Sequence, residues 1–175
     1  VLATDDGGTG GDLTFENAGR VAFWDLSIGL TLQGNAYTLV GDIATLATAI
    51  NAKPWGYFAW AKDYDASIDG AYKTSPVAVA FVGTFEGLGN TIKRLKIHST
   101  GLEDVGLFSS MVEFSAVIRD LGLPSVDITS GGVHVGALVG SFAGGTILNW
   151  DATGEITGNN AQYVGGLVGV DVELN

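Results

Sequence analysis

The sequence predicts an all-β fold, a right-handed parallel β-helix (β-solenoid) with an N-terminal β-rich cap that contains one short α-helix. Three observations predict it. Two short motifs recur at a near-constant interval, each copy is bounded by Gly, Ser, Asn or Asp, and the chain holds 27 glycines with only 15% charged residues. A strand-length motif that returns in this way is typical of stacked coils, which bury a continuous apolar column.

The first motif is a Val-Gly pair followed by apolar residues and, in two copies, by a second glycine. Its copies begin at Val105 (VGLFSS), Val135 (VGALVGS) and Val164 (VGGLVGV), so the two intervals are almost equal. The first copy lacks the final glycine. Glycine permits positive φ at a coil corner, and its missing side chain lets neighbouring backbones approach closely. We therefore expect the three copies to stack in register.

The second motif alternates apolar and polar residues between copies of the first. It begins at Ile92 (IKRLKI), Ile118 (IRDLGL) and Ile147 (ILNWDA), and the first of its two intervals is slightly the shorter. Such alternation indicates a strand with one buried face. We expect these three copies to form a second column of parallel strands.

The stretch from Gly132 to Gly145, GVHVGALVGSFAGG, carries glycine at every fourth position up to Gly144 and no charge. This spacing is typical of paired transmembrane helices. However, the 20-residue window from Thr129 to Leu148 holds six glycines and five residues from Ser, Thr and His. The other repeats also lack the ladder, so stable insertion is disfavoured. We expect a strand, a corner and the approach to the next strand, with no membrane insertion of this segment.

The totals limit the classes of partner. The formal net charge is −11, no Lys or Arg follows Arg119, and there is no cysteine. Binding to nucleic acid or to anionic lipid needs a cationic surface, so both are disfavoured. Disulfides and thiolate metal sites are excluded, and we expect no cofactor.

The chain divides into three predicted parts. We expect residues 1–12 to be a flexible leader, residues 13–82 to hold N-terminal strands, a helix at about 42–52 and a capping segment, and residues 83–175 to form solenoid coils truncated from a longer chain. Asp42 is a suitable N-cap for the apolar stripe that starts at Ile43. Such a helix is expected to cover the end of the solenoid, which otherwise exposes strand edges.

Several blocks, taken in order, resemble one known family. They are GNAYTL at 34–39, DIATL at 42–46, YFAWAKDYDA at 57–66, GTFEGLGNTI at 83–92 and the Val-Gly copies. Together they resemble bacterial secreted exoproteins of the filamentous-haemagglutinin type with GLUG-motif repeats, which are exported by two-partner secretion. The resemblance implies a long parallel β-helix, an extracellular or bacterial cell-surface location, and a role as an adhesin or surface fibre.

Two groups of side chains are candidate contacts. Aromatic rings near the start of the solenoid can stack on sugars, although alternation predicts that half of them are core residues. The only basic cluster lies beside the inward-facing Leu95 and Ile97, where a solvated face is the alternative. The candidates for contact with a glycan or partner are Trp55, Tyr57, Trp60, Tyr64, Lys93, Arg94 and Lys96.

Catalytic and metal motifs are weak. The run Asp5 to Asp12 nearly fits a calcium-binding nonapeptide but occurs once, and Asp63, Asp65 and Asp69 mimic an EF-hand loop without its turn glycine or bidentate Glu. His98 and His134 lack metal-ligand spacing. We therefore assign no catalytic, metal or cofactor residue.

The leading hypothesis is a non-enzymatic extracellular structural or adhesive module, active in adhesion, biofilm or fibre formation, whose partner is a cell-surface glycan or protein receptor. One alternative is a β-helix carbohydrate-active enzyme, such as a polysaccharide lyase or hydrolase, that uses Lys93 or Arg94. The other is a fibre subunit that self-associates through solenoid ends.

Overall fold

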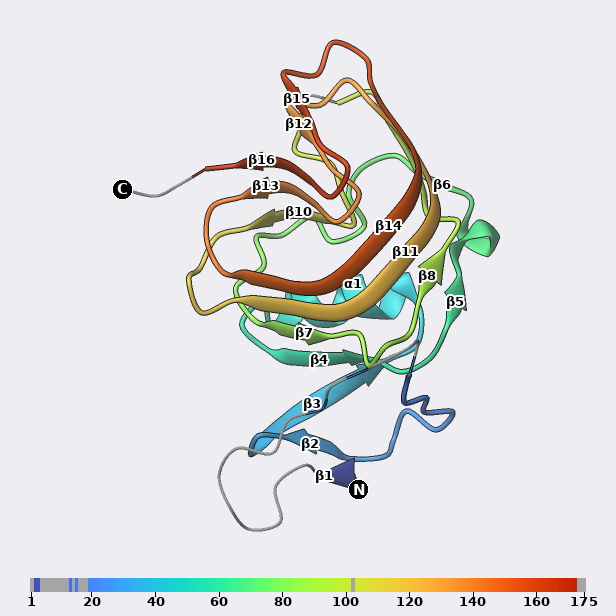
Figure 1. The fold of residues 1–175 in the computed structure, drawn as a ribbon, viewed down its shortest axis with the longest axis vertical. Coiled ribbons are helices and arrows are strands. Elements are labelled where there is room, and N and C mark those ends of the chain that lie inside the picture. Colours follow the sequence, from blue (N-terminus) through green and yellow to red (C-terminus); the bar gives the residue numbers. More distant parts are fainter. Residues whose placement is uncertain (1, 4–12, 14, 16–18, 102, 173–175) are drawn as a thin grey trace.

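The computed structural model describes residues 2–3, 13, 15, 19–101 and 103–172, and it is a β-solenoid of about four turns with one short α-helix (Figure 1). The parallel β-solenoid expected from the repeats is therefore confirmed. The leader expected at residues 1–12, with its calcium-repeat-like run, lies outside the described residues except for β1 (Leu2–Ala3), which pairs with β2 (Leu30–Leu32).

Four coils make up the solenoid. Coil 1, residues 57–83, contains β4 (Tyr57–Trp60), β5 (Tyr64–Asp65), the 3-10 helix η1 (Ala66–Asp69) and β6 (Ala71–Tyr72). Coil 2, residues 84–116, contains β7 (Thr84–Glu86), β8 (Ile92–Lys93), β9 (Lys96–Ser99) and β10 (Phe108–Met111). Coil 3, residues 117–145, contains β11 (Val117–Ser130), β12 (His134–Val135) and β13 (Val139–Phe142). Coil 4, residues 146–172, contains β14 (Thr146–Gly158), β15 (Tyr163–Val164) and β16 (Val168–Asp171).

The strands of successive coils pair in parallel and in register, which builds three faces. The first face stacks β4, β7 and the first residues of β11 and β14, the second stacks β6, β9 and the last residues of β11 and β14, and the third stacks β10, β13 and β16. Apolar residues of successive coils therefore lie one above another. The column on the first face is Phe58, Phe85, Ile118 and Ile147, and the column on the second face is Tyr72, Ile97, Ile128 and Ile156.

The Val-Gly motif stacks as its spacing predicted, with Val105 bridged to Val135 and Val135 paired with Val164. Its glycines are required by close backbone contacts. A Cβ added to Gly140 would lie 2.5 Å from the backbone nitrogen of Val105, and one added to Gly169 would lie 2.5 Å from that of Val135. In coils 3 and 4 the second glycine of the motif therefore lies against the valine of the preceding coil.

In coil 2 the position of that second glycine is taken by Ser109. The coil before it has no Val-Gly pair there. Instead, the Ser109 hydroxyl donates to the carbonyl oxygen of Ala78 at 2.9 Å. The missing glycine in the first copy of the motif is thus explained by a different neighbour.

One predicted alignment is wrong. Ile118 pairs with Ile147 as expected, but its partner in coil 2 is Phe85 and not Ile92. Ile92 follows Thr91, which bridges to Gly122. Ile92 and Ile118 therefore occupy different positions within their coils, so the interval between them is not the length of one coil.

The parallel register also begins earlier than the boundary expected at residues 82 and 83. β4, β5 and β6 pair in parallel with β7, β8 and β9, so coil 1 lies within the segment expected to be the cap. Among the described residues, those before 57 lie outside the coils.

A hairpin and a helix precede the coils. β2 and β3 (Asn35–Val40) are antiparallel, and the turn between them holds Gln33 at φ 50° and Gly34 at φ 78°. Two successive positive φ values are those of a type I′ turn, which matches strand twist. β3 then adds in parallel to β4.

The helix α1 (Ile43–Ala52) confirms the expected helix and its cap, because the Asp42 side chain accepts a hydrogen bond from the Thr45 amide at 2.7 Å. Its buried residues, Ile43, Leu46 and Ile50, belong to the same core as Phe81. Residues 76–79 belong to coil 1 and lie next to β10 of coil 2 on the third face. α1 lies beside these residues, so the helix covers the N-terminal end of that face. Among the described residues, no helix has the length and apolar character needed to cross a membrane.

Candidate functional site

A groove of about 450 Å³ lies where the coils bend after the first face. Phe15 lines it from the N-terminal segment, and the coils contribute Thr91, Asp120, Asn149 and Asp151. The groove is rich in oxygen acceptors.

The bend itself is built from two stacked polar residues. Asp120 in β11 and Asn149 in β14 have φ of 57° and 52°, and the amide of Asn149 donates to Oδ1 of Asp120 at 2.8 Å. Asn and Asp adopt the left-handed region more readily than other residues with a side chain. The two coils therefore turn in step, and the side chains that turn them also bond the coils together.

A buried ion pair lies next to this bend. Glu86 is fully buried; one of its carboxylate oxygens contacts Nε of Arg119 at 2.5 Å, and the other accepts from the Leu88 amide at 2.9 Å. Burial raises the pKa of Glu86 to about 7, against the opposing effects of the Leu88 hydrogen bond and Arg119. Asp120, 3.8 Å from the Arg119 guanidinium, adds a second negative charge.

Such a pKa is suited to proton transfer near neutral pH, but a general acid must also reach its substrate. Glu86 has no exposed surface, and both of its oxygens are bonded within the protein. We therefore interpret the pair as a contact between coils 2 and 3.

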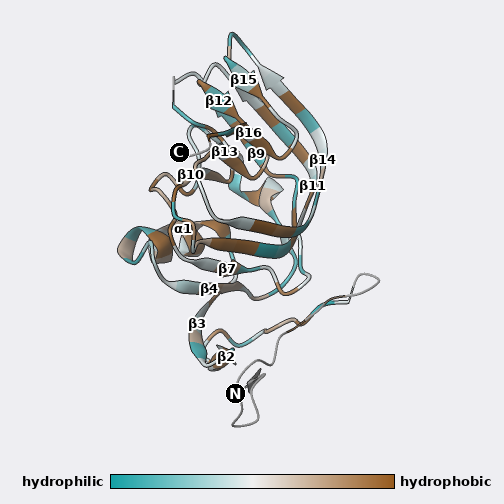
Figure 2. Ribbon diagram, turned by 60° about the vertical axis from the view of Figure 1, so that its left-hand side comes forward, coloured by the Kyte–Doolittle hydropathy of each residue, from teal (hydrophilic) through white to brown (hydrophobic). Residues whose placement is uncertain are grey.

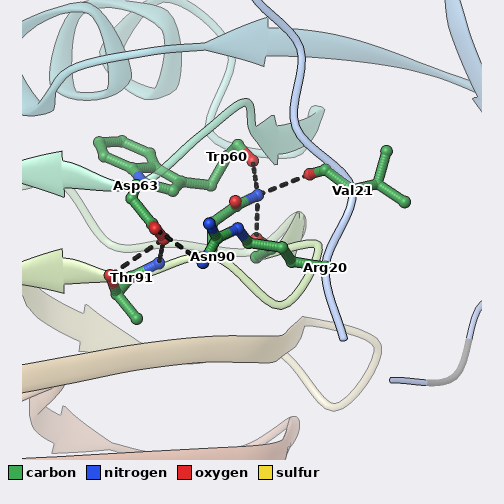
Figure 3. A network of polar contacts seen from close by, with 7 residues as sticks. Arg20, Val21, Trp60, Asp63, Asn90 and Thr91 are labelled. Atoms are coloured by element: carbon green, nitrogen blue, oxygen red, sulfur yellow. Dashed lines mark hydrogen bonds and ion pairs between the residues drawn. The ribbon is translucent and has the colours of Figure 1, made fainter. Parts of the chain in front are cut away.

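Asn90 ties the N-terminal strap, residues 19–24, to the solenoid (Figure 3). Its side-chain amide donates to the carbonyl oxygens of Val21 at 2.8 Å, Trp60 at 3.1 Å and Gly87 at 3.3 Å. The Val21 amide donates in turn to the carbonyl oxygen of Leu88 at 3.0 Å. One buried side chain thus joins the strap, coil 1 and coil 2.

Asp63 makes a second connection in the same region. Its Oδ1 accepts from the amide and the hydroxyl of Thr91 at 2.9 and 3.1 Å, and its other oxygen lies 3.0 Å from Arg20 of the strap. Figure 3 shows the Asp63 carboxylate directed at Thr91, next to the contacts of Asn90. This connection again joins coil 1, coil 2 and the strap.

Of the four candidate aromatic residues, one is fully buried, one is half-buried and two are exposed. Trp60 is fully buried in edge-on contact with Tyr64, with ring centroids 5.9 Å apart. The prediction that Trp60 contacts a ligand is therefore wrong, because its ring packs between coils. Trp55 and Tyr57 are exposed at 63% and 37%, and the Tyr57 ring lies 5.3 Å from that of Tyr37.

Tyr64 is half-buried, and its hydroxyl is bonded within the protein. It donates to Oδ1 of Asp69 at 2.6 Å, and the hydroxyl of Tyr72 donates to the other oxygen at 2.7 Å. Burial, followed by these contacts with Asp69, raises the pKa of both tyrosines. Tyr64 is thus occupied in a contact across the first coil.

The basic cluster is exposed but largely paired. Arg94 binds Asp65 of coil 1 through two hydrogen bonds, and Lys96 lies 2.9 Å from Asp127 of coil 3. Hydrogen bonds from Lys96 and then His98 hold the pKa of Asp127 below its usual range. Lys93 is exposed at the surface. As the alternation predicted, Leu95 and Ile97, on either side of Lys96, are buried.

The remaining titratable candidates are dispersed. His98 contacts Asp127 at 3.2 Å and His134 contacts Asp104 at 2.7 Å, each between neighbouring coils. The three carboxylates of the EF-hand-like run have separate partners. Within the described part of the chain, no three His, Cys, Asp or Glu side chains are grouped to hold a metal ion.

Reasoning from the sequence missed Glu86, Asn90 and Arg119. The first two lie in the GTFEGLGNTI block, which was used only for the family resemblance. A signal was present, because an acid and an amide in a block of Gly and apolar residues indicate buried polar groups that need partners.

Comparison with known proteins relates the chain to part of a longer one. No protein-family model matches the chain, and no solved structure matches it. Halomucin from Haloquadratum walsbyi (strain DSM 16790 / HBSQ001) is 33% identical to it over 151 residues. The match covers 83% of this chain and 1% of halomucin, so the chain is similar to one short region of a much longer protein.

Proposed function

We propose that this chain is a non-enzymatic structural or adhesive module of a secreted or cell-surface protein, of the filamentous-haemagglutinin type with GLUG-motif repeats. The proposal rests on one observation: acidic, basic and amide side chains of the kinds that act in catalysis form ion pairs and hydrogen bonds between neighbouring coils. The pairs are Glu86 with Arg119, Asp65 with Arg94, Asp127 with Lys96, and Asp120 with Asn149. These bonds, added to the apolar columns, favour a stiff rod over an open reaction site.

The likeness to halomucin supports this proposal in two ways. The chain corresponds to about one hundredth of that protein, as expected of one module in a long chain. The name denotes a mucin, a class of surface or secreted protein, which favours the same location here.

Trp55 and Tyr57 are the proposed adhesive contact. Both rings are exposed and close in sequence, and Tyr57 is backed by Tyr37. Aromatic faces stack on the apolar faces of sugar rings, so the proposed partner is a glycan.

The test is to immobilise the purified chain and measure both the retention of a panel of neutral and acidic polysaccharides and the release of new chain ends. We expect retention without release, and a loss of roughly tenfold in affinity for Trp55→Ala, which is about 1.4 kcal/mol. Trp24→Ala is the matched control, because Trp24 is 82% exposed and the centroid of its ring lies 4.7 Å from the Lys62 ammonium.

Two outcomes would contradict the proposal. Equal losses for Trp24→Ala and Trp55→Ala would reject the adhesive contact. Release of chain ends that disappears in Lys93→Ala or Arg94→Ala would establish the carbohydrate-active enzyme instead. The pairing of Arg94 with Asp65 does not favour that alternative, since a base held by a carboxylate is poorly placed to take a proton from a sugar.

A further inference from the structure

Two exposed aromatic side chains lie in turns at one corner of the solenoid. Apolar side chains of the coils are mostly in strands, and Figure 2 shows hydrophobic bands along β11 and β14. Trp55 and Phe114 instead lie in turns and are exposed at 63% and 73%. Trp55 comes just before β4, and Phe114 lies between β10 and β11, so both are where the third face leads into the first. Phe114 is not one of the contacts predicted from the sequence.

The two turns have the same construction. The Gly56 amide donates to the carbonyl oxygen of Lys53 at 2.9 Å, and the Ala116 amide donates to that of Glu113 at 2.9 Å. Each bond closes a four-residue β-turn that has its aromatic residue at one of the two central positions. Both rings are therefore displayed at the tips of closed turns.

A glycine of the next coil packs against each turn. A Cβ added to Gly83 of coil 1 would lie 2.3 Å from the carbonyl oxygen of Gly56, and one added to Gly145 of coil 3 would lie 2.7 Å from that of Ala116. This close packing on the backbone of a coil holds both turns in place. Rings held in this way lose little conformational entropy when a ligand binds.

The turn of coil 2 is the longest of three at this corner. The residues in register before the corner are Phe81, Met111 and Phe142, and those in register after it are Thr84, Val117 and Thr146. The corner therefore spans residues 82–83 in coil 1, 112–116 in coil 2 and 143–145 in coil 3. Figure 1 shows the turn between β10 and β11 (yellow) reaching further outward than its neighbours. Phe114 is thus not covered by the coils on either side.

One coil separates the two turns along the solenoid axis. The Val82 amide donates to the carbonyl oxygen of Pro54 at 3.2 Å, so Val82 lies over the first turn. The Val117 amide donates to that of Gly83 at 2.9 Å, so the second turn belongs to the coil above. Two strand spacings of about 4.8 Å place the turns about 10 Å apart along the axis.

The surroundings of the rings favour a glycan over a protein partner. Lys53, Glu113 and Ser115, which lie beside the rings in sequence, are exposed. The rings are therefore separate apolar faces among polar groups, whereas the core of a protein interface is a continuous apolar patch. A sugar offers one apolar face to a ring and hydroxyl groups to the polar side chains around it. The formal net charge of −11 opposes a polyanionic chain and favours a neutral one.

We propose that Trp55 and Phe114 form one binding site for a neutral, extended β-1,4-linked glycan that lies along the solenoid axis. Each sugar of such a chain advances by close to one strand spacing and is turned over relative to the sugar before it. Sugars two apart therefore present the same face, and the two rings stack on alternate sugars. This inference rests on the proposed function and adds its second contact residue and its ligand class.

The test is calorimetric titration of the full chain with cellobiose, cellohexaose, chitohexaose and the α-1,4-linked maltohexaose. A disaccharide reaches one ring only, so we expect a β-1,4-linked hexamer to bind roughly tenfold or more tightly than cellobiose. Maltohexaose coils, and we expect it to gain nothing from its length. Phe114→Ala is expected to abolish the gain from length and to leave the affinity for cellobiose nearly unchanged.

Two variants are matched controls. Ile68→Ala removes an apolar side chain of similar exposure, 75%, from η1 of coil 1, and Phe114→Tyr keeps an aromatic ring at the proposed contact. We expect both variants to keep the gain from length. Equal losses for Ile68→Ala and Phe114→Ala would overturn the proposal.

Three further results would also overturn it. They are no gain from length for either β-1,4-linked hexamer, an equal gain for maltohexaose, and a gain that survives Phe114→Ala. Sedimentation of the chain as a dimer that Phe114→Ala dissociates would make a second copy the occupant instead.

Failure of this inference is distinguishable from failure of the proposed function. Retention of a polysaccharide that depends on Trp55 and not on Phe114 would reject the two-ring site and keep the adhesive contact. Retention of no polysaccharide at all would reject the adhesive contact itself.

Discussion

The two ends of the solenoid are built from the same repeat and differ in what covers them. At the N-terminal end, β3, α1 and the strap at 19–24 lie over coil 1, and polar contacts through Asn90 and Asp63 tie the strap down. At the C-terminal end, coil 4 has a neighbour on one side only among the described residues. The burial of a side chain in a solenoid therefore depends on the number of neighbouring coils. Equivalent side chains at the two ends contribute different amounts to the free energy of unfolding.

The largest expected effect compares two isoleucines of one column. Ile118→Ala is expected to lower the free energy of unfolding by about 2 to 5 kcal/mol, because Ile118 is fully buried between coils 2 and 4. Ile147→Ala, one coil further on, is expected to cost roughly 1 kcal/mol, since one side of Ile147 faces solvent. Urea denaturation of both variants measures the difference.

The second-face column supplies an independent pair. Ile128→Ala and Ile156→Ala are expected to repeat the inequality, because Ile128 is buried and Ile156 is half-buried. Equal losses within either pair would mean that coil 4 is covered in solution.

A smaller effect concerns the charge buried near the N-terminal end. Burial raises the pKa of Glu86 to about 7, so between pH 4.5 and 7 the folded chain holds a proton that the unfolded chain has released. Stability of the wild type is therefore expected to fall as pH rises through this window, by up to roughly 3 kcal/mol. Glu86→Gln keeps an acceptor for the Leu88 amide and cannot ionise, so its stability curve is expected to be flatter.

Denaturation of both proteins from about pH 4.5 to 7.5 measures this slope. Glu113→Gln is the control, because Glu113 is exposed and its replacement is expected to leave the wild-type slope unchanged. Arg119 and Asp120 are the charged groups that face Glu86. Curves for the wild type and Glu86→Gln that run parallel across the window would refute the assignment.

The smallest effect tests the helix that covers the N-terminal end. Asp42→Ala removes the acceptor for the Thr45 amide and is expected to cost about 1 kcal/mol of stability. Asp25→Ala is the control: Asp25 accepts from the Ser27 amide at 2.9 Å in an exposed turn, where we expect a smaller change than for Asp42→Ala. A larger loss for Asp25→Ala, measured by thermal unfolding, would show that the turn after the strap limits stability more than α1.

Much of the fold could be predicted from the sequence because local features specify it. The Val-Gly copies at 105, 135 and 164 predicted their own register, and Asp42 predicted the start of α1. The misplaced partner of Ile118 shows the limit. Apolar alternation identifies a strand, but the length of the turn before it decides which coil position it fills.

The candidate site was predicted less well. Alternation correctly placed Lys93, Arg94 and Lys96 outward, yet the carboxylates that pair with Arg94 and Lys96 lie in other coils, far away in sequence. Trp60 and Trp55 are both aromatic residues near one strand, and only the neighbouring coil determines that the first is buried.

By itself the sequence determined the repeat, its parallel stacking, the helix and its cap, because periodicity and turn residues act over short distances. Only the tertiary structure decided that Glu86 meets Arg119, that Asn90 holds the strap, and that, among the described residues, one end is covered while the other is open. The physical reason is that these properties belong to pairs of coils. A residue in a solenoid acquires its burial, its partner and its pKa from the coils above and below it.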